Sequence, residues 1–141
     1  MAYDFLPYPM EANFSNRVRD VISYAREESL RLGHDYIGPE HIVLGLIRDG
    51  EGMAVKLLVN VGLDLHTLRK AIEKSVRVSN SNLHIANIPL TKQAEKVIRA
   101  AYLEAKAFRC DTILTEHLLL SLIRDEDNVA AQIINRHGIS Y

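Results

Sequence analysis

Two Glu-His pairs are the residues of this sequence best suited to acid–base or metal chemistry. Glu40–His41 and Glu116–His117 stand at the same point of two similar segments, YIGPEHIVLGLIRD and TILTEHLLLSLIRD. A carboxylate beside an imidazole can act as a general acid and base, and both side chains can ligate a metal. On a helix, however, neighbouring side chains point about 100° apart, which is poor geometry for chelating one ion. The spacing therefore disfavours a metal site.

No motif of a known enzyme class accompanies these pairs. The sequence lacks the GxxxxGK[ST] phosphate loop, HExxH and GxSxG, and its 6 histidines are dispersed. The single cysteine, Cys110, cannot form a disulfide within the chain and has no flanking feature that would activate it. We therefore expect an inert, half-buried thiol, no catalytic residues and a chain that is not an enzyme.

The composition is that of an ordinary globular domain. The chain has 141 residues, of which 48% are hydrophobic and 25% are charged, and its net charge is −1. This balance disfavours a nucleic acid as a partner, a helix-turn-helix included, and an anionic membrane surface. Neither a secretory signal nor an apolar run of about 18 residues is present. We therefore expect a cytoplasmic protein.

The sequence contains an internal duplication. A shift of 76 positions aligns residues 15–63 with 91–139 without a gap. The fifteen identical pairs are Val21/Val97, Ile22/Ile98, Ala25/Ala101, Glu28/Glu104, Asp35/Asp111, Ile37/Ile113, Glu40/Glu116, His41/His117, Leu44/Leu120, Leu46/Leu122, Ile47/Ile123, Arg48/Arg124, Asp49/Asp125, Ala54/Ala130 and Gly62/Gly138. The Glu-His pairs belong to this repeat.

Each copy reads as a series of helices, so the fold class is all-α. Apolar residues at the 3.6-residue period predict a first helix after Ser15 and after Thr91, each of which could act as an N-cap. A second helix beginning at Pro39 is apolar around nearly its whole circumference and should be buried. Further helices are expected over about 52–61, 64–76 and 128–137.

The repeat also divides the chain. We expect an N-terminal extension over 1–13, a first helical repeat over 14–76, a linker rich in Ser and Asn over 77–90, and a second repeat over 91–141, all in one compact domain. Copy two stops where its fourth helix would begin, so we expect its last helix to be truncated and the chain to be a fragment of a longer protein.

The Glu-His pairs have two interpretations. In the first, which the residues by themselves favour, Glu40 and Glu116 complement the dipole of a buried helix, and His41 and His117 pack and form hydrogen bonds.

In the second interpretation, a polar pocket lies between two helix starts of the same copy. One start is at Ser15 or Thr91, and the other is near Pro39 or Thr115. Free first-turn amides can hold a phosphate, and a neighbouring carboxylate can bind a guanidinium. Together these groups would suit a modified arginine.

The segment LRLGHDYIGPEHIVLGLIRDGEG, followed in register by DTILTEHLLLSLIRDED, resembles the duplicated N-terminal domain of Clp unfoldases, most nearly the ClpC branch. The resemblance covers the chain from Phe14 onward. It implies two four-helix motifs related by a pseudo-twofold axis. It also implies a non-catalytic domain that binds protein substrates and adaptor proteins and is monomeric in isolation. No cofactor would bind here: ATP would bind in the parent protein's ATPase rings, which work with the Clp peptidase.

The resemblance to the ClpC branch also implies binding of phosphoarginine, with one site in each copy. Glu40 and Glu116 match the residues that take the guanidinium, and Ser15 and Thr91 match the phosphate side.

This sequence departs from the family motif Gly-Thr-Glu-His at two positions. Pro39 replaces Thr in copy one, and Leu114 replaces Gly in copy two. Because Pro39 removes a hydroxyl and an N–H donor, we expect a weakened or altered first site. The alternative function is a stand-alone accessory protein that docks on a Clp protease assembly. The parent reading frame would distinguish the two.

Overall fold

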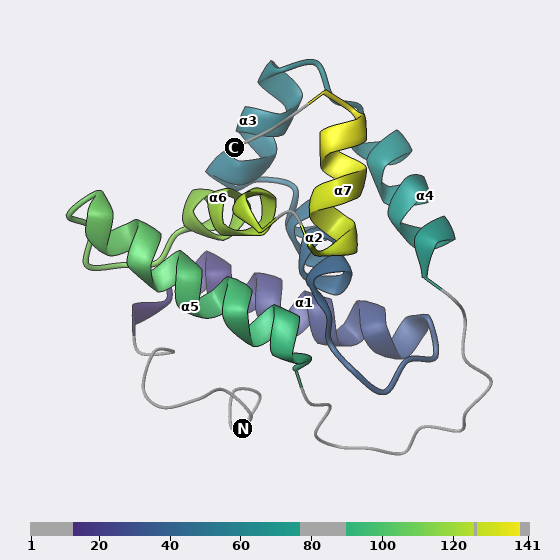
Figure 1. Cartoon of the computed structure of the whole chain (residues 1–141), viewed down its shortest axis with the longest axis horizontal. Helices are drawn as coiled ribbons and strands as arrows, with labels where there is room; N and C mark the ends of the chain where they lie inside the picture. The colour runs from purple at the N-terminus through teal and green to yellow at the C-terminus, as the bar shows by residue number, and fades with distance from the viewer. Residues whose placement is uncertain (1–12, 77–89, 126, 139–141) are drawn as a thin grey trace.

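Two apolar helices, α2 (Pro39–Asp49) and α6 (Thr115–Arg124), lie at the centre of the computed structural model (Figure 1). The structure describes residues 13–76, 90–125 and 127–138. Within these ranges every named element is an α-helix, which confirms the predicted all-α class. The other five are α1 (Asn16–Arg31), α3 (Met53–Asn60), α4 (Leu65–Ser75), α5 (Lys92–Ala107) and α7 (Val129–Arg136).

The first helix of each copy starts at the predicted N-cap. The Ser15 hydroxyl accepts from the N–H of Val18 at 3.1 Å, and the Thr91 hydroxyl accepts from the N–H of Ala94 at 3.0 Å. Pro39 is the first residue of α2, where an N–H has no partner within the helix. The predicted caps and the predicted start of α2 are therefore confirmed.

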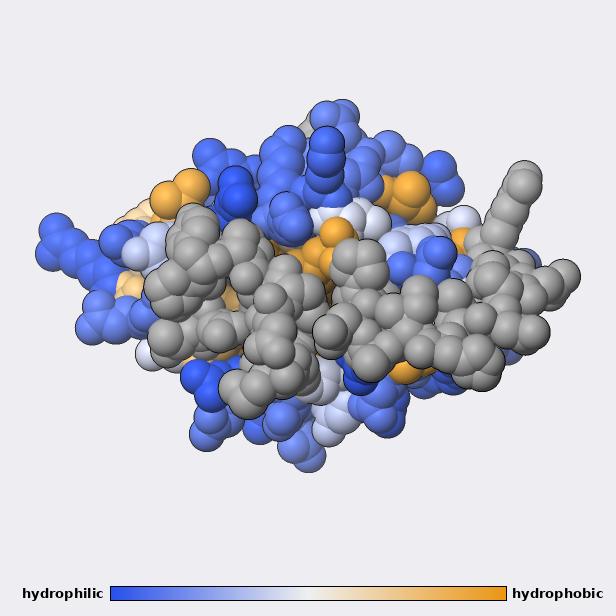
Figure 2. Space-filling view, turned by 90° about the horizontal axis from the view of Figure 1, so that it is seen from below, coloured by the Kyte–Doolittle hydropathy of each residue, from blue (hydrophilic) through white to orange (hydrophobic). Residues whose placement is uncertain are grey.

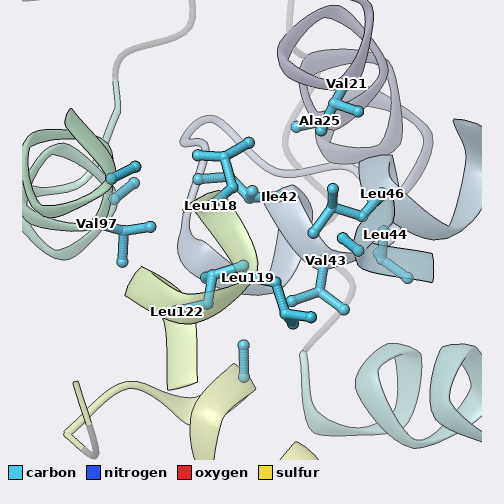
Figure 3. Close-up of a cluster of buried hydrophobic side chains, with 14 of the residues drawn as sticks. Val21, Ala25, Ile42, Val43, Leu44, Leu46, Val97, Leu118, Leu119 and Leu122 are labelled. Carbon is cyan, nitrogen blue, oxygen red and sulfur yellow. The ribbon is translucent and has the colours of Figure 1, made fainter. Parts of the chain in front are cut away.

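The core lies between the outer helices and the central α2 and α6 (Figure 3). All residues from 39 to 46 are buried, as the apolar circumference of α2 predicts. Helix α1 lies close to α2 at Gly45, where a Cβ atom would be 2.5 Å from the carbonyl oxygen of Val21. In copy two the equivalent residue, Ser121, donates its hydroxyl to the carbonyl oxygen of Val97.

The two copies are joined crosswise just before their helices begin. The N–H of Ser15 donates to the carbonyl oxygen of Ile113 at 3.0 Å, and the N–H of Thr91 donates to that of Ile37 at 3.0 Å. Each first helix therefore starts beside the second helix of the other copy. Two parallel β-bridges accompany these bonds: Phe14–Ile113 and Ile37–Leu90.

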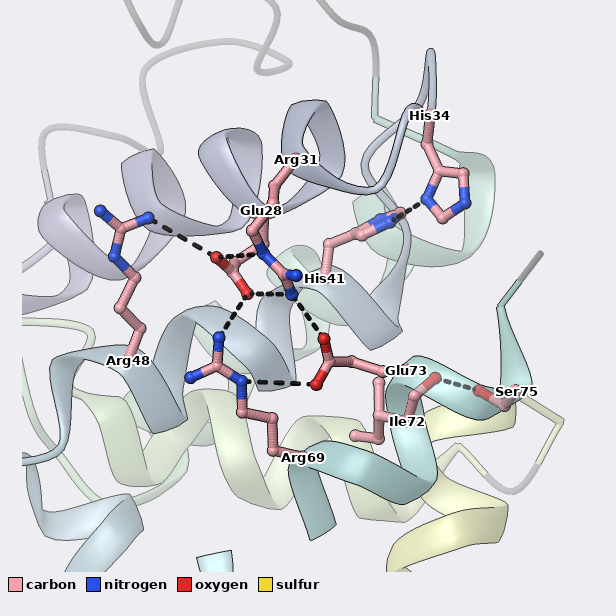
Figure 4. A network of polar contacts seen from close by, with 9 residues as sticks. All are labelled: Glu28, Arg31, His34, His41, Arg48, Arg69, Ile72, Glu73 and Ser75. Carbon is pink, nitrogen blue, oxygen red and sulfur yellow. Dashed lines mark hydrogen bonds and ion pairs between the residues drawn. The ribbon is translucent and has the colours of Figure 1, made fainter. Parts of the chain in front are cut away.

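A buried carboxylate ties α4 to α1 and α2. Glu28 of α1 lies 3.0 Å from Arg31, 3.6 Å from Arg48 of α2 and 3.6 Å from Arg69 of α4 (Figure 4). Arg31 also lies 2.8 Å from Glu73 of α4. Because a buried charge is costly unless it is paired, this arrangement fixes α4 against the rest of copy one.

Parts of the predicted domain organisation fall outside the described residues. This holds for residues 1–12 of the extension and 77–89 of the linker, whereas Leu90 takes part in a bridge to Ile37. None of the described helices is both long and apolar enough to cross a membrane. Around the grey atoms of Figure 2, the visible face is mostly hydrophilic, and hydrophobic residues form separate patches.

Candidate ligand-binding site

Two of the predicted site residues, Ser15 and Glu116, line the same surface depression. It has a volume of about 420 Å³ and lies where α1, α3 and α6 begin. The depression is lined by Ser15, Arg17, Glu51, Gly52, Met53, Lys56, Leu114, Thr115 and Glu116. The structure therefore brings a helix-capping hydroxyl and a carboxylate of the predicted set together.

The pairing of these residues differs from the sequence prediction. We predicted that each copy carries its own site, formed by two of its own helix starts. Instead, Ser15 of copy one shares a depression with Glu116 of copy two. In the equivalent contact, the N–H of Thr91 donates to the carbonyl oxygen of Ile37, three residues before Glu40. The crosswise backbone hydrogen bonds cause this exchange, because they place the start of each first helix beside the other copy.

The depression at Ser15 offers both signs of charge. Ser15 accepts one hydrogen bond from Val18, so its own O–H can still donate to a ligand. Arg17, which lies 3.0 Å from Asp49 and 3.7 Å from Glu51, and Lys56 supply positive charge. Glu51 and the half-buried Glu116 supply negative charge. The site can therefore receive a group that carries an anion and a cation side by side.

Sequence reasoning did not identify Arg17 and Lys56. Their counterparts in copy two are Gln93 and Gln132, so the repeat gave no signal at these positions. Both cations join the site only because α1 and α3 begin next to α6.

Glu40 has a different environment from Glu116. The residue is 8% exposed, and its carboxylate lies against Gly38. Burial raises the pKa of this carboxyl, although a hydrogen bond from its own backbone N–H and the nearby His34 act in the opposite direction. The two glutamates are therefore not equivalent.

His41 and His117 have the structural role that the first interpretation assigns to them. The Nδ1 atom of His41 accepts from the N–H of Gly38 at 2.9 Å, and that of His117 accepts from the N–H of Leu114 at 2.9 Å. Each ring therefore satisfies a backbone donor at the start of its helix. In copy one the Nε2 atom of His41 also lies 2.8 Å from Nδ1 of His34 (Figure 4).

Helix capping explains why copy one tolerates a proline at position 39, where copy two has the threonine Thr115. Its counterpart, Thr115, accepts from the N–H of Ala54 at 3.2 Å and so caps α3, which begins after Gly52 and has no side-chain cap of its own. In copy two, α7 begins after Asn128, whose side chain accepts from the N–H of Ala131. A hydroxyl at position 39 is therefore not needed for that cap.

The chemistry of the described residues gives no alternative site of a familiar kind. Among them, no group of three His, Cys, Asp or Glu side chains is placed to hold a metal ion. Cys110 is half-buried and donates its thiol to the carbonyl oxygen of Thr112 at 3.0 Å.

Comparison with known proteins places the chain in one family. The family model of the Clp repeat (R) N-terminal domain matches residues 13–137. The chain is 40% identical over 131 residues to the negative regulator of genetic competence ClpC/MecB of Bacillus subtilis, and 39% identical over 131 residues to the chaperone protein ClpB of Oceanobacillus iheyensis. These matches cover 93% of the chain but only 16% of each relative.

Solved structures support the fold. The N-terminal domain of the chaperone ClpD from Arabidopsis thaliana superimposes with a TM-score of 0.73 at 22% identity, over 96% of this chain and 91% of that one. The Hsp104 N-terminal domain from Candida albicans gives a TM-score of 0.76 at 18% identity, over 91% of this chain and 83% of that one.

Proposed function

Because the chain belongs to the Clp repeat N-terminal domain family, we propose that it recognises protein substrates and adaptor proteins for an ATP-dependent Clp unfoldase. The ATPase modules and the peptidase of such an assembly would be its further partners. The site described above favours a recognition role, because it combines capping and charged groups rather than a nucleophile with a base.

The ligand class that fits this site is a protein segment carrying phosphoarginine. One observation carries this proposal: the Ser15 hydroxyl and the Glu116 carboxylate line one depression together with Arg17 and Lys56. Phosphoarginine has a phosphoryl group bonded directly to a guanidinium, so it needs donors and an acceptor side by side.

Each group of the ligand has a counterpart in the depression. The O–H of Ser15 and the first-turn amides of α1 can donate to phosphate oxygens, and Arg17 and Lys56 add positive charge. The carboxylate of Glu116 can accept from the guanidinium N–H groups. A phosphoserine would leave this carboxylate facing an anion, whereas a plain arginine would leave the donors unused.

Calorimetric titration with a phosphoarginine peptide tests the proposal. We expect binding that Glu116→Ala weakens by about tenfold or more, because a charge-assisted hydrogen bond is lost. The matched control is Glu27→Ala, an exposed glutamate of α1 paired with Arg48 at 3.7 Å, which should leave the affinity unchanged.

The same peptide with unmodified arginine or with phosphoserine should bind far more weakly. The proposal fails if no heat of binding is detected at millimolar peptide. It also fails if Glu40→Ala combined with Glu116→Ala leaves the affinity as it was.

A further inference from the structure

A surface groove with a volume of about 370 Å³ lies between α5 and the end of α6. Its apolar lining comes from Val97, Ala100 and Leu103 of α5. Leu103 is 64% exposed, so an apolar side chain faces solvent here. The groove shares no lining residue with the depression at Ser15 and is therefore a separate place on the molecule.

The internal repeat shows what kind of group fits at this place. Copy one carries Tyr24 at the position of Ala100 and Arg48 at the position of Arg124. The central guanidinium carbon of Arg48 lies 4.7 Å from the centre of the Tyr24 ring, and Tyr24 is half-buried. Copy one therefore fills the equivalent place with an aromatic ring of its own, stacked against an arginine.

Copy two keeps the arginine but not the tyrosine. Arg124 lies 2.9 Å from Glu104, and Arg48 lies 3.6 Å from the equivalent Glu28, so the same carboxylate anchors both guanidinium groups. The groove is lined by both Ala100 and Arg124. Because the alanine side chain ends at Cβ, the groove stays open where copy one has its ring.

The charges around the groove are paired with each other. Lys96 lies 3.7 Å from Asp125, and Arg124 is paired with Glu104. An anion or a cation therefore meets no excess of opposite charge. A neutral ring can instead cover part of Leu103 and stack on the face of the Arg124 guanidinium, while the edge of that group keeps its bond to the carboxylate.

We propose that this groove binds an aromatic side chain of a protein partner. The ring lies against Ala100 and Leu103, and Arg124 covers its face. This is the arrangement that Tyr24 and Arg48 have within copy one. The site uses neither a phosphoryl group nor the guanidinium of a ligand, so it goes beyond the proposed function and stands if phosphoarginine does not bind.

Titration of the full 141-residue chain with p-cresol, the side chain of tyrosine with its Cβ, tests the ring-binding chemistry. We expect amide NMR shifts that gather around positions 100 and 124 and saturate with a dissociation constant in the millimolar range, as suits a ligand of this size. Methylcyclohexanol, a saturated compound of similar size, should bind about two- to fivefold more weakly, because it has no π face. The proposal fails if no shifts saturate at about 20 mM p-cresol, or if they gather elsewhere.

Residues taken from copy one provide the matched variants. Ala100→Tyr fills the groove with the ring that copy one carries and should abolish p-cresol binding. Leu103→Glu introduces the residue of copy one, Glu27, at an exposed position, so it should weaken binding severalfold while the circular dichroism spectrum stays the same. This second variant keeps the test decisive if Ala100→Tyr does not fold. Wild-type affinity in either folded variant would overturn the proposal.

The role of the arginine has its own control. Arg124→Gln should weaken p-cresol binding by about two- to fivefold and should remove the preference for p-cresol over methylcyclohexanol. Arg99→Gln changes an exposed arginine of α5 that does not line the groove, and it should leave both affinities unchanged. A preference that survives Arg124→Gln would contradict the proposal.

A peptide decides whether the ring can belong to a protein partner. A short peptide of glycine and serine with one central tyrosine should shift the same amides as p-cresol, and the same peptide with a central alanine should not. If p-cresol binds but the tyrosine peptide does not, the groove accepts only a small molecule and the proposal is wrong. Phosphoarginine binding should be unchanged in Leu103→Glu, since that residue lies outside the depression at Ser15.

Discussion

The imidazole of His41 is fully buried and is held in one tautomer. Its Nδ1 atom accepts from the N–H of Gly38, so in the neutral ring the proton is on Nε2, which lies 2.8 Å from Nδ1 of His34. A further proton would have to bind Nδ1 and so displace the hydrogen bond from the N–H of Gly38. Burial, together with the nearby His34, lowers the pKa of His41 to about 4.

This environment predicts a loss of stability in acid. Above a pH of about 6.5 His41 is neutral in both the folded and the unfolded chain, whereas at lower pH the unfolded chain alone takes up the proton until about pH 4. The free energy of unfolding should therefore fall by up to about 3 kcal/mol over this range. The raised pKa of Glu40 acts in the opposite sense and reduces the net change.

Urea unfolding at several pH values checks this prediction. The His41→Asn protein should be less stable than wild type at pH 7. Its free energy of unfolding should, however, fall less than that of wild type when the pH is lowered. His66→Asn, a change at an exposed histidine of α4, should keep the wild-type dependence. An unaltered acid dependence in His41→Asn would show that another group is responsible.

Helices α1 and α2 pack closely because position 45 carries no side chain. The nearest atoms to an added Cβ are the carbonyl oxygen of Val21 at 2.5 Å and the backbone nitrogen of Ala25 at 3.1 Å. Both belong to the backbone of α1, which cannot move aside as a side chain can. In copy two the same contact is made by Ser121, whose hydroxyl bonds to the backbone of α5.

Gly45→Ala should therefore destabilise the protein, although alanine favours a helix by about 1 kcal/mol over glycine. We expect a net loss of about 1–3 kcal/mol in the free energy of unfolding, because α1 and α2 must separate. The control is Ser121→Ala, which keeps a Cβ that the structure already accommodates and should cost about 1 kcal/mol. Denaturant midpoints measure both, and a Gly45→Ala protein as stable as wild type would refute the expectation.

Equivalent positions of the repeat differ in exposure because of how the helices assemble. Leu57 of α3 is 41% exposed, whereas its counterpart in α7, Ile133, is 4% exposed. Helix α4 of copy one packs against α7 of copy two, and within the described residues no helix takes the corresponding place on α3. We attribute the difference in burial to this arrangement.

The same substitution should therefore have different effects at these two positions. Ile133→Ala leaves a cavity beneath α4 and should lower the free energy of unfolding by about 2–4 kcal/mol. Leu57→Ala removes a partly solvated side chain and should cost less than about 1 kcal/mol. Thermal and urea unfolding of the two variants provide the measurement. Similar losses would mean that α4 does not protect α7 in solution.

Much of the fold could be predicted because it depends on local sequence. The N-caps at Ser15 and Thr91, the start of α2 at Pro39 and the burial of residues 39–46 could be predicted. They follow from side chains within one turn of each helix start or from the apolar period. The helices predicted over 52–61 and 128–137 also form within those limits. The identity of the candidate site residues came from the resemblance and from their places at helix starts.

The pairing of those site residues and the difference between the two glutamates could not be predicted from the repeat. Long-range backbone bonds, such as that between Ser15 and Ile113, decide that Ser15 of copy one lies in the same depression as Glu116 of copy two. The position of the Glu40 carboxylate depends on the absence of a side chain at Gly38, which matters only once the start of α2 has folded. Sequence likewise gave no reason to connect Lys56 with Glu116.

The sequence by itself determined the helices, their caps and the duplication, because these follow from hydrophobic period, capping chemistry and identity between segments. Only the tertiary structure decided which residues meet, how far each glutamate is exposed and which face α4 covers. The physical reason is that contacts between distant segments depend on the packing of the whole core. Two copies of one motif therefore acquire different surroundings, as the buried Glu40 and the half-buried Glu116 show.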